Sequence, residues 1–297
     1  MPKDKVVGIL GLLGGVALFS TVEVASKIIG PTVDPMVIAF IRFFVTGIVL
    51  LGISVPTIWR RTEPLGWKDF WVFCLNGIIG VTLTMSLFHI AIIVLAKAAS
   101  AAVVMSANPV FVLILSRYVN NEDWSAQKWI SVTLGMVGAF FFAYESGVLS
   151  TNSLKGLGIM LAAAFFFALS ICISRRFVPI YGGAVLMGYS SLIGSLLLLP
   201  FALYRLPVQG LEEIYDSWPT IAFVSLVGTA LAYIFYYYGI LKTSAQTASF
   251  AFLLKPILSC ILAAMVLHET INAHMIIGSV LILSGLLLTI PFPKLYS

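Results

Sequence analysis

Two charged side chains stand four residues apart in the first long apolar stretch of the chain. Glu23 and Lys27 would share one face of a helix, in the order that favours an ion pair. A charge deep in a membrane segment costs about 2.5–3.5 kcal/mol on insertion scales, so it usually faces a partner or a cavity. Two interpretations of Glu23 stay open: a structural partner of Lys27, or a cavity-facing site that binds protons or cations.

Three further polar residues interrupt apolar stretches. Arg42 lies about two turns into the second stretch, where helix packing is the favoured role and substrate contact the alternative. Asn108 and Lys255 each precede a proline, Pro109 and Pro256. A proline within a helix kinks it and leaves a backbone carbonyl one turn earlier without its hydrogen bond, so that carbonyl needs another polar partner. We expect both residues to line a cavity, where the amine of Lys255 would suit a carboxylate or phosphate. Hydrogen bonding between helices is the alternative.

A histidine and two tyrosines complete the set of candidate binding residues. His89 could accept a proton near neutral pH, although a packed, hydrogen-bonded role is slightly favoured. Tyr233 and Tyr237 would lie on one helix face, where rings with polar tips suit an amphipathic or aromatic substrate. Anchoring at the membrane interface explains tyrosines in this region equally well.

The elements that carry these residues must be solvated by lipid. The chain has 297 residues, of which 60% are hydrophobic and 10% charged, with a mean hydropathy of +1.06. Soluble domains are about 45–50% apolar and about 25% charged. Unbroken apolar runs such as 156–173 leave no alternating polar face for a barrel. The sequence therefore predicts an all-α membrane protein.

Several classes of function are disfavoured. The net charge of +5 is scattered at segment ends and forms no aromatic-interleaved basic patch, so no nucleic acid partner is expected. No nucleotide-binding loop, zinc signature or nucleophile motif occurs, which predicts no cofactor, no metal site and no enzymatic activity. A membrane enzyme or a non-transporting receptor subunit stays as the alternative from another class.

Proline, glycine and charged residues interrupt the apolar stretches at intervals that predict ten transmembrane helices. They run over residues 6–29, 33–56, 69–93, 97–119, 127–144, 155–177, 182–204, 218–239, 243–267 and 273–291. Most lysines and arginines fall on one set of loops if both termini are cytoplasmic. We therefore expect a multi-pass protein of the cytoplasmic (inner) membrane with both ends inside.

The two halves of the chain resemble each other. Residue types recur at an offset of 147 or 148: Pro109 with Pro256, Glu122 with Glu269, Gly138 with Gly285, Gly8 with Gly156 and Gly80 with Gly228. This predicts two five-helix repeats, 1–148 and 149–297, forming one membrane unit. An odd number of helices per repeat inverts the second copy in the membrane, which is the arrangement of alternating-access transporters.

Two blocks with the same pattern carry a family resemblance. Residues 99–109 read ASAAVVMSANP and lead to Glu122, whereas residues 246–256 read QTASFAFLLKP and lead to Glu269. Together with the pair Arg42-Phe43, these blocks resemble the drug/metabolite transporter superfamily, specifically the EamA-type ten-helix permeases. We expect both glutamates to lie in loops and to make capping or gate-closing contacts.

The resemblance implies export or exchange of small metabolites such as amino acids through a central cavity, with energy from ion or substrate gradients. The superfamily also contains carriers of nucleotide sugars and sugar phosphates, so the substrate stays open. A proton-coupled exporter of cationic drugs is the alternative, because small multidrug relatives bind cations at a lone first-helix carboxylate, for which Glu23 is the candidate. The expected partners are a small-molecule substrate, the lipid bilayer and, in the alternative, protons. The oligomeric state stays open.

Overall fold

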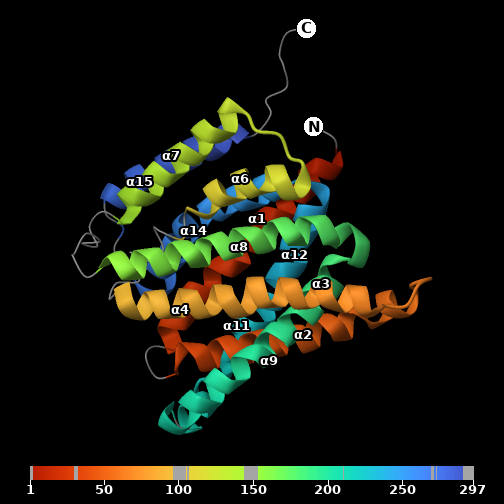
Figure 1. Ribbon diagram of the computed structural model, residues 1–297. Helices are drawn as coiled ribbons and strands as arrows, with labels where there is room; N and C mark the ends of the chain where they lie inside the picture. The colour runs from red at the N-terminus through yellow and green to blue at the C-terminus, as the bar shows by residue number, and fades with distance from the viewer. Residues whose placement is uncertain are drawn as a thin grey trace.

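The computed structural model describes residues 3–29, 33–95, 105, 107–143, 153–209, 211–268, 271 and 273–289, and within them every regular element is helical (Figure 1). The first half contains α1 (Lys3–Ile29), α2 (Pro35–Trp59), α3 (Trp67–Gly77), the π-helical η2 (Ile78–Leu83), α4 (Thr84–Leu95), α6 (Asn108–Asn120) and α7 (Ala126–Ala143). The second half contains α8 (Ser153–Tyr181), α9 (Gly183–Gln209), α10 (Glu212–Asp216), α11 (Trp218–Ser225), the π-helical η4 (Leu226–Leu231), α12 (Ala232–Lys242), α13 (Ala245–Ala251), the 3₁₀ turn η5 (Phe252–Leu254), α14 (Lys255–Leu267) and α15 (Ala273–Thr289).

The helices form an elongated bundle suited to lipid. Seven helices in the described part of the chain are long and apolar enough to cross a membrane. Large apolar side chains such as Ile48, Ile53 and Phe140 are exposed on the outside, as expected where lipid replaces water. The predicted all-α membrane fold is confirmed, whereas the number of ten spanning helices stays a prediction.

Helix bounds recur at the offsets found in the sequence. The π-helical segments η2 and η4 coincide at an offset of 148, and so do the first residues of α2 and α9, Pro35 and Gly183. Helices α6 and α14 coincide at 147, and each ends on a left-handed residue, Asn121 or His268. Each pair of segments therefore has the same local backbone. The division into repeats at 148 itself stays a prediction.

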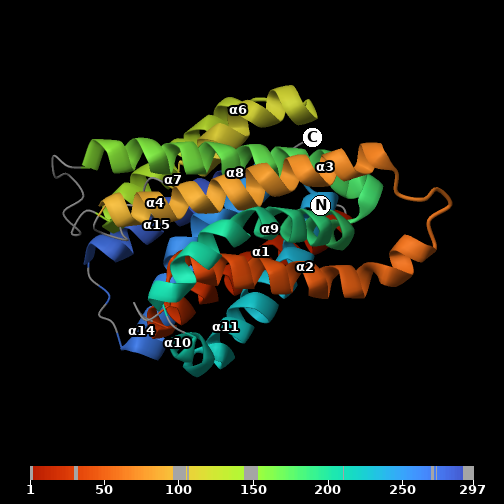
Figure 2. The ribbon, with the colours of Figure 1, turned by 60° about the horizontal axis from the view of Figure 1, so that its bottom comes forward.

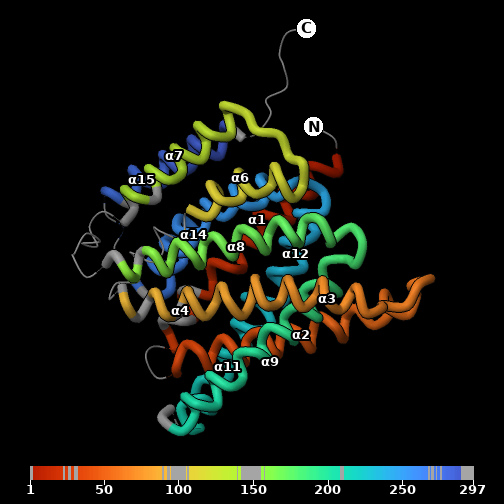
Figure 3. The backbone as a smooth tube through the Cα atoms, viewed as in Figure 1, coloured from red at the N-terminus to blue at the C-terminus, as the bar shows by residue number. Residues whose placement is uncertain are grey.

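The most extensive helix packing joins the two halves to each other. The leading pairs are α7 with α15, α2 with α9, α1 with α12, α4 with α8, α6 with α8, α3 with α9 and α1 with α14. Exchanging the halves converts all of these pairs except α3 with α9 into members of the same set, so the helices pack with an approximate two-fold relation. Figures 2 and 3 show α7 beside α15 and α4 beside α8 from two directions.

Small residues bring α1 and α12 into close contact. A Cβ added to Gly15 would lie 2.9 Å from the Tyr236 backbone nitrogen, and one added to Gly11 would lie 3.1 Å from the Phe235 carbonyl oxygen. Contact distances this short need glycine. The close approach fixes the position of α12, which carries the tyrosine side chains discussed next.

Candidate functional site

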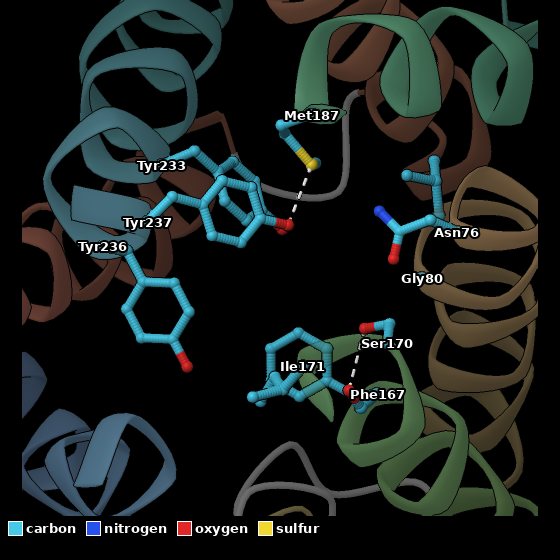
Figure 4. Close-up of a pocket in the computed structure, with 10 residues that line it drawn as sticks. Asn76, Gly80, Phe167, Ser170, Ile171, Met187, Tyr233, Tyr236 and Tyr237 are labelled. Atoms are coloured by element: carbon cyan, nitrogen blue, oxygen red, sulfur yellow. Dashed lines mark hydrogen bonds between the residues drawn. The ribbon is translucent and has the colours of Figure 1, made fainter. Parts of the chain in front are cut away.

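A cavity lies at the centre of the bundle, between the two halves (Figure 4). It is narrow in this conformation, with room for about a single water molecule. The first half contributes part of α3 and η2, and the second half contributes α8, α9 and α12. The lining residues are Asn76, Gly80, Val81, Phe167, Ser170, Ile171, Met187, Tyr233, Tyr236 and Tyr237. The cavity is thus built where the two halves meet.

A chain of hydrogen bonds crosses one wall of the cavity. The Asn76 amide nitrogen donates to the Ser190 hydroxyl (3.1 Å), and the Ser174 hydroxyl donates to the Asn76 amide oxygen (3.2 Å). The Ser174 and Tyr237 hydroxyls lie 3.0 Å apart, and the Tyr237 hydroxyl donates to the Met187 sulfur (3.4 Å). A buried amide needs such partners, because an unpaired one loses its hydration without compensation. The network ties α3, α8, α9 and α12 together without any charged group.

Aromatic rings adjoin this network, and four of them line the cavity: Phe167, Tyr233, Tyr236 and Tyr237. Phe19 of α1 lies 4.9 Å from the Tyr233 ring centroid and 5.6 Å from that of Phe252. Phe252 in turn lies 5.1 Å from Tyr236 and 5.4 Å from Phe167, both in edge-to-face geometry. Aromatic pairs at these distances attract each other beyond simple burial. The rings therefore form a connected wall, called here the aromatic wall: Phe19, Phe167, Tyr233, Tyr236, Tyr237 and Phe252.

The π-helical segment η2 shapes the edge of the cavity. A π-bulge frees a carbonyl from the α-helical ladder, and such bulges are common at functional sites. Here the Thr84 hydroxyl donates to the Ile79 carbonyl, five residues back, at 2.7 Å. A Cβ added to Gly80 would lie 3.0 Å from the Ser170 Cβ atom, so glycine permits this close approach of η2 to α8.

The structure brings two of the residues predicted from sequence to the cavity. Tyr233 and Tyr237 both line it, on successive turns of α12. Arg42 is half-buried on α2, with its guanidinium carbon 4.7 Å from the Phe43 ring centroid and within electrostatic range of Tyr233. Its Nε atom has no hydrogen-bond partner in the described part of the chain.

Other predicted residues lie elsewhere. Asn108 is buried at the start of α6, where its amide nitrogen donates to the Ala164 carbonyl of α8 (3.1 Å), and it is not among the residues lining the cavity. Lys255, half-buried, is the first residue of α14 and does not line the cavity either. Pro109 and Pro256 are the second residues of α6 and α14, and η5 directly precedes α14.

Three predicted side chains cannot be placed. Glu23 and Lys27 lie within α1 and His89 lies within α4, but their side chains are outside the described residues, as is Glu269. The ion pair between Glu23 and Lys27, and the proton or cation site at Glu23, therefore stay predictions.

Glu122 makes a contact between the halves. Its two carboxylate oxygens accept hydrogen bonds from the backbone N–H groups of Ala245 (2.7 Å) and Gln246 (3.1 Å), at the start of α13. The Gln246 side chain donates to the Ser116 hydroxyl of α6 at 2.8 Å. A carboxylate is favourable beside the unpaired N–H groups that begin a helix. The predicted capping contact of Glu122 is confirmed, and it joins the first half to the second.

Sequence reasoning missed most of the polar network. Asn76, an amide within an apolar stretch, carries a signal of the kind that marks functional positions in membrane helices. Ser170, Ser174 and Ser190 carry none, because serine is common in such helices. The rings of Phe19, Phe167 and Phe252 could not be told apart from lipid-facing rings before the helices were placed.

Comparison with known proteins yields a consistent set of matches. The model of the EamA-like transporter family matches residues 6–144 and again residues 154–290. An "Uncharacterized transporter" of Clostridium kluyveri is 29% identical over 94% of this chain and 91% of its own length. The "S-adenosylmethionine uptake transporter" of Rickettsia prowazekii is 24% identical over 97% of this chain and 94% of its own length. A solved structure with 18% identity superposes with a TM-score of 0.79 over 95% of this chain and 96% of that one, a likeness of fold.

Proposed function

Since the chain belongs to the EamA-like transporter family, we propose that it carries small metabolites across the cytoplasmic membrane by alternating access. It is a multi-pass membrane transporter, and the resemblance to the drug/metabolite transporter superfamily is confirmed. The observation that supports the proposed mechanism most directly is the central cavity, which takes its walls from both halves. A site at such a seam can open to either side when the halves rock against each other.

The narrowness of the cavity fits a closed or nearly closed conformation. Pockets that hold drug-sized ligands are about 300–1,000 Å³, whereas the space here has room for about a single water molecule. Rocking of the halves would widen it. The Glu122 contact with α13 would have to form and break during that movement, because it joins residues of different halves.

The proposed substrates are small metabolites such as amino acids, moved outward or in exchange. The relative from Rickettsia prowazekii adds S-adenosylmethionine as a candidate, with uptake as the direction. Both solutes combine a polar part with an apolar or ring-bearing part. The cavity has matching surfaces, since members of a hydrogen-bonding network and aromatic rings both line it.

Charge within the first helix supports the competing proposal, a proton-coupled exporter of cationic drugs through Glu23. The Glu23→Gln variant decides between them: an unchanged pH dependence of transport dismisses proton coupling at this residue. The family and the names of the relatives are those of transporters, which disfavours the membrane enzyme or non-transporting receptor subunit.

The orientation proposed from the basic residues has both termini in the cytoplasm. Tags at the two ends, digested by protease from one side of sealed vesicles, test it. Protection of one tag and loss of the other would refute an even number of spans.

A binding screen followed by flux tests the function. The purified protein is screened by thermal shift against amino acids, nucleosides, sugar phosphates, S-adenosylmethionine and cationic drugs, because a ligand of the folded state raises its Tm. Solutes that bind are then tested for uptake into proteoliposomes. We expect at least one to accumulate, and the Ser174→Ala variant to slow it. Folded protein that moves none of these solutes would overturn the proposal.

A further inference from the structure

We propose that Tyr236 selects the substrate by a hydrogen bond from its hydroxyl group to a planar, ring-bearing solute held against the aromatic wall. This inference rests on the proposed transport function and narrows it to one substrate class: metabolites with a flat aromatic group that carries polar atoms at its edge.

The Tyr236 hydroxyl is buried yet unpaired. The residue is 1% exposed, and its oxygen has no hydrogen-bond partner in the described part of the chain. The neighbouring Tyr237 is the opposite case, since its hydroxyl contacts both Ser174 and Met187. A phenol that is buried normally finds a partner. The hydroxyl of Tyr236 is therefore the polar group at this cavity that finds no partner among the described residues.

The position of Tyr236 suits contact with a solute. Its ring forms one wall of the cavity, and its hydroxyl lies away from the network around Asn76 (Figure 4). The ring cannot withdraw with its helix, because Gly15 of α1 already contacts the Tyr236 backbone: a Cβ at Gly15 would be 3.0 Å from the Tyr236 Cβ atom. The hydroxyl is thus held in place at the cavity.

The rings around Tyr236 suit a flat solute: Phe167, Tyr233 and Tyr237 line the cavity with it, and Phe19 and Phe252 support its ring without lining the cavity. Phe19 and Phe252 each meet Tyr236 edge to face, with ring centroids 5.8 Å and 5.1 Å away. A flat ring can join such an arrangement through the same edge-to-face contacts. None of the ten described residues lining the cavity is acidic or basic. The part of the solute bound here is therefore flat and uncharged, with hydrogen-bonding atoms at its edge.

The test compares two conservative variants on the same helix. Tyr236→Phe removes only the buried hydroxyl, whereas Tyr238→Phe removes a hydroxyl from a residue that is 45% exposed. The probes are adenosine and L-tryptophan, with ribose and L-leucine as ringless controls. Binding is followed by thermal shift of the purified full chain, with and without each probe.

The two variants should differ in their affinity for the ring-bearing probes. Without solute, Tyr236→Phe should melt at the wild-type temperature or above, because it loses a hydroxyl with no partner. With adenosine or L-tryptophan, its affinity should fall about 5- to 100-fold, the range for losing a hydrogen bond at a buried group. Tyr238→Phe should bind as the wild type does, and the ringless controls should bind weakly to all three proteins.

Three results would overturn the inference. They are a clear loss of Tm in Tyr236→Phe without solute, equal affinity of that variant and the wild type for the ring-bearing probes, and no stabilisation of the wild type by either probe. Each leaves the proposed function standing if proteoliposomes still take up another solute. Absence of uptake of every solute would instead refute transport itself.

Discussion

The π-helical segments η2 and η4 occupy the same place in the two halves but have different neighbours. Both span six residues, and at both a threonine hydroxyl donates to a carbonyl five residues back, at 2.7 Å, although the threonines are not at equivalent positions: Thr84, just after η2, donates to Ile79, and Thr229, within η4, donates to Val224. Yet η2 borders the cavity and η4 does not. A Cβ at Gly228 of η4 would lie 2.7 Å from Val22 of α1, where the two helices are tightly packed.

The side chains around the two segments have diverged further than the backbone. Tyr233, Tyr236 and Tyr237 of α12 line the cavity, whereas Met85, Phe88 and His89 stand at the equivalent positions of α4. Conversely, Asn76 of α3 corresponds to the buried Val224 of α11. The backbone arrangement is therefore repeated, whereas the polar side chains at the cavity are not: the phenol groups come from the second half and the amide from the first. In the proposed mechanism the repeated backbone arrangement would allow rocking to either side, and the different lining of the two halves would select the solute.

The largest effect is expected where the α1–α12 contact differs from its counterpart. Gly15 of α1 corresponds to Ala163 of α8, so the contact of α1 with Tyr236 depends on a glycine that the second half lacks at this position. Gly15→Val should destabilise the protein by about 3 kcal/mol, the upper range for overpacking, as measured by the unfolding midpoint in detergent. Gly14→Val is the matched control, since a Cβ there would have its nearest neighbour at 3.7 Å. Equal loss in both variants would contradict the close approach.

The second-largest effect is expected from removing the Asn76 amide, which only the first half carries. Asn76→Val installs the residue found at the equivalent position of the second half and leaves Ser190 and Ser174 without that partner. We expect a loss of about 1–3 kcal/mol, the penalty for unpaired buried groups, together with slower transport. Ser190→Ala, which removes one bond of the same network, should have a smaller effect. A variant with wild-type stability would show that the network contributes nothing.

The Glu122 contact tests whether the halves separate at this junction. Glu122→Ala leaves two N–H groups at the start of α13 unpaired and should cost about 0.5–2 kcal/mol, as for other helix caps. Asp123→Ala is the control, because Asp123 pairs with Arg117 at an exposed position.

The same pair of variants reports on access to the cavity. With Ser170→Cys as the labelling site, Glu122→Ala should raise modification by a membrane-impermeant maleimide from the side on which Glu122 lies. Unchanged labelling would mean that this contact does not restrain the movement of the halves.

The smallest effect is expected in the stability of two variants that each remove one neighbouring phenol hydroxyl, Tyr237→Phe and Tyr236→Phe. Tyr237→Phe loses contacts with Ser174 and Met187 and should lower stability by about 0.5–1.5 kcal/mol. Tyr236→Phe, without solute, should not. If both variants melt alike, the hydroxyl of Tyr236 has a partner or that of Tyr237 makes no useful bond.

Much of the fold could be predicted from the sequence, because helices in a membrane are marked by patterns of neighbouring residues. Apolar runs of membrane length, ended by charge or proline, predicted the helices, and the offset of 148 anticipated that η2 and η4 would coincide. Gly11 and Gly15, four residues apart, have the spacing typical of a close helix contact, and α1 meets α12 at both. The π-helical form of η2 and η4 was not foreseen, since no residue pattern in either segment demands it.

The sequence predicted only part of the candidate site. Tyr233 and Tyr237 were predicted to lie on one face and do reach the cavity, and Glu122 was predicted to cap a helix and does. Asn108, expected at the cavity because it precedes Pro109 as Lys255 precedes Pro256, instead makes the alternative contact, a hydrogen bond between helices to the Ala164 carbonyl of α8. The role of each of these residues in binding stays a prediction.

By itself the sequence determined that this protein is a bundle of membrane helices with a doubled pattern, because helix length, hydropathy and recurrence are properties of neighbouring residues. Only the tertiary structure decided that Asn76, Ser174 and Tyr237 meet, and that the Tyr236 hydroxyl beside them has no partner in the part of the chain that the structure describes. In lipid the outside of a helix is as apolar as its packed face, so the sequence does not mark which face turns inward. The rotation of each helix, and with it the lining of the cavity, is set by how the helices pack.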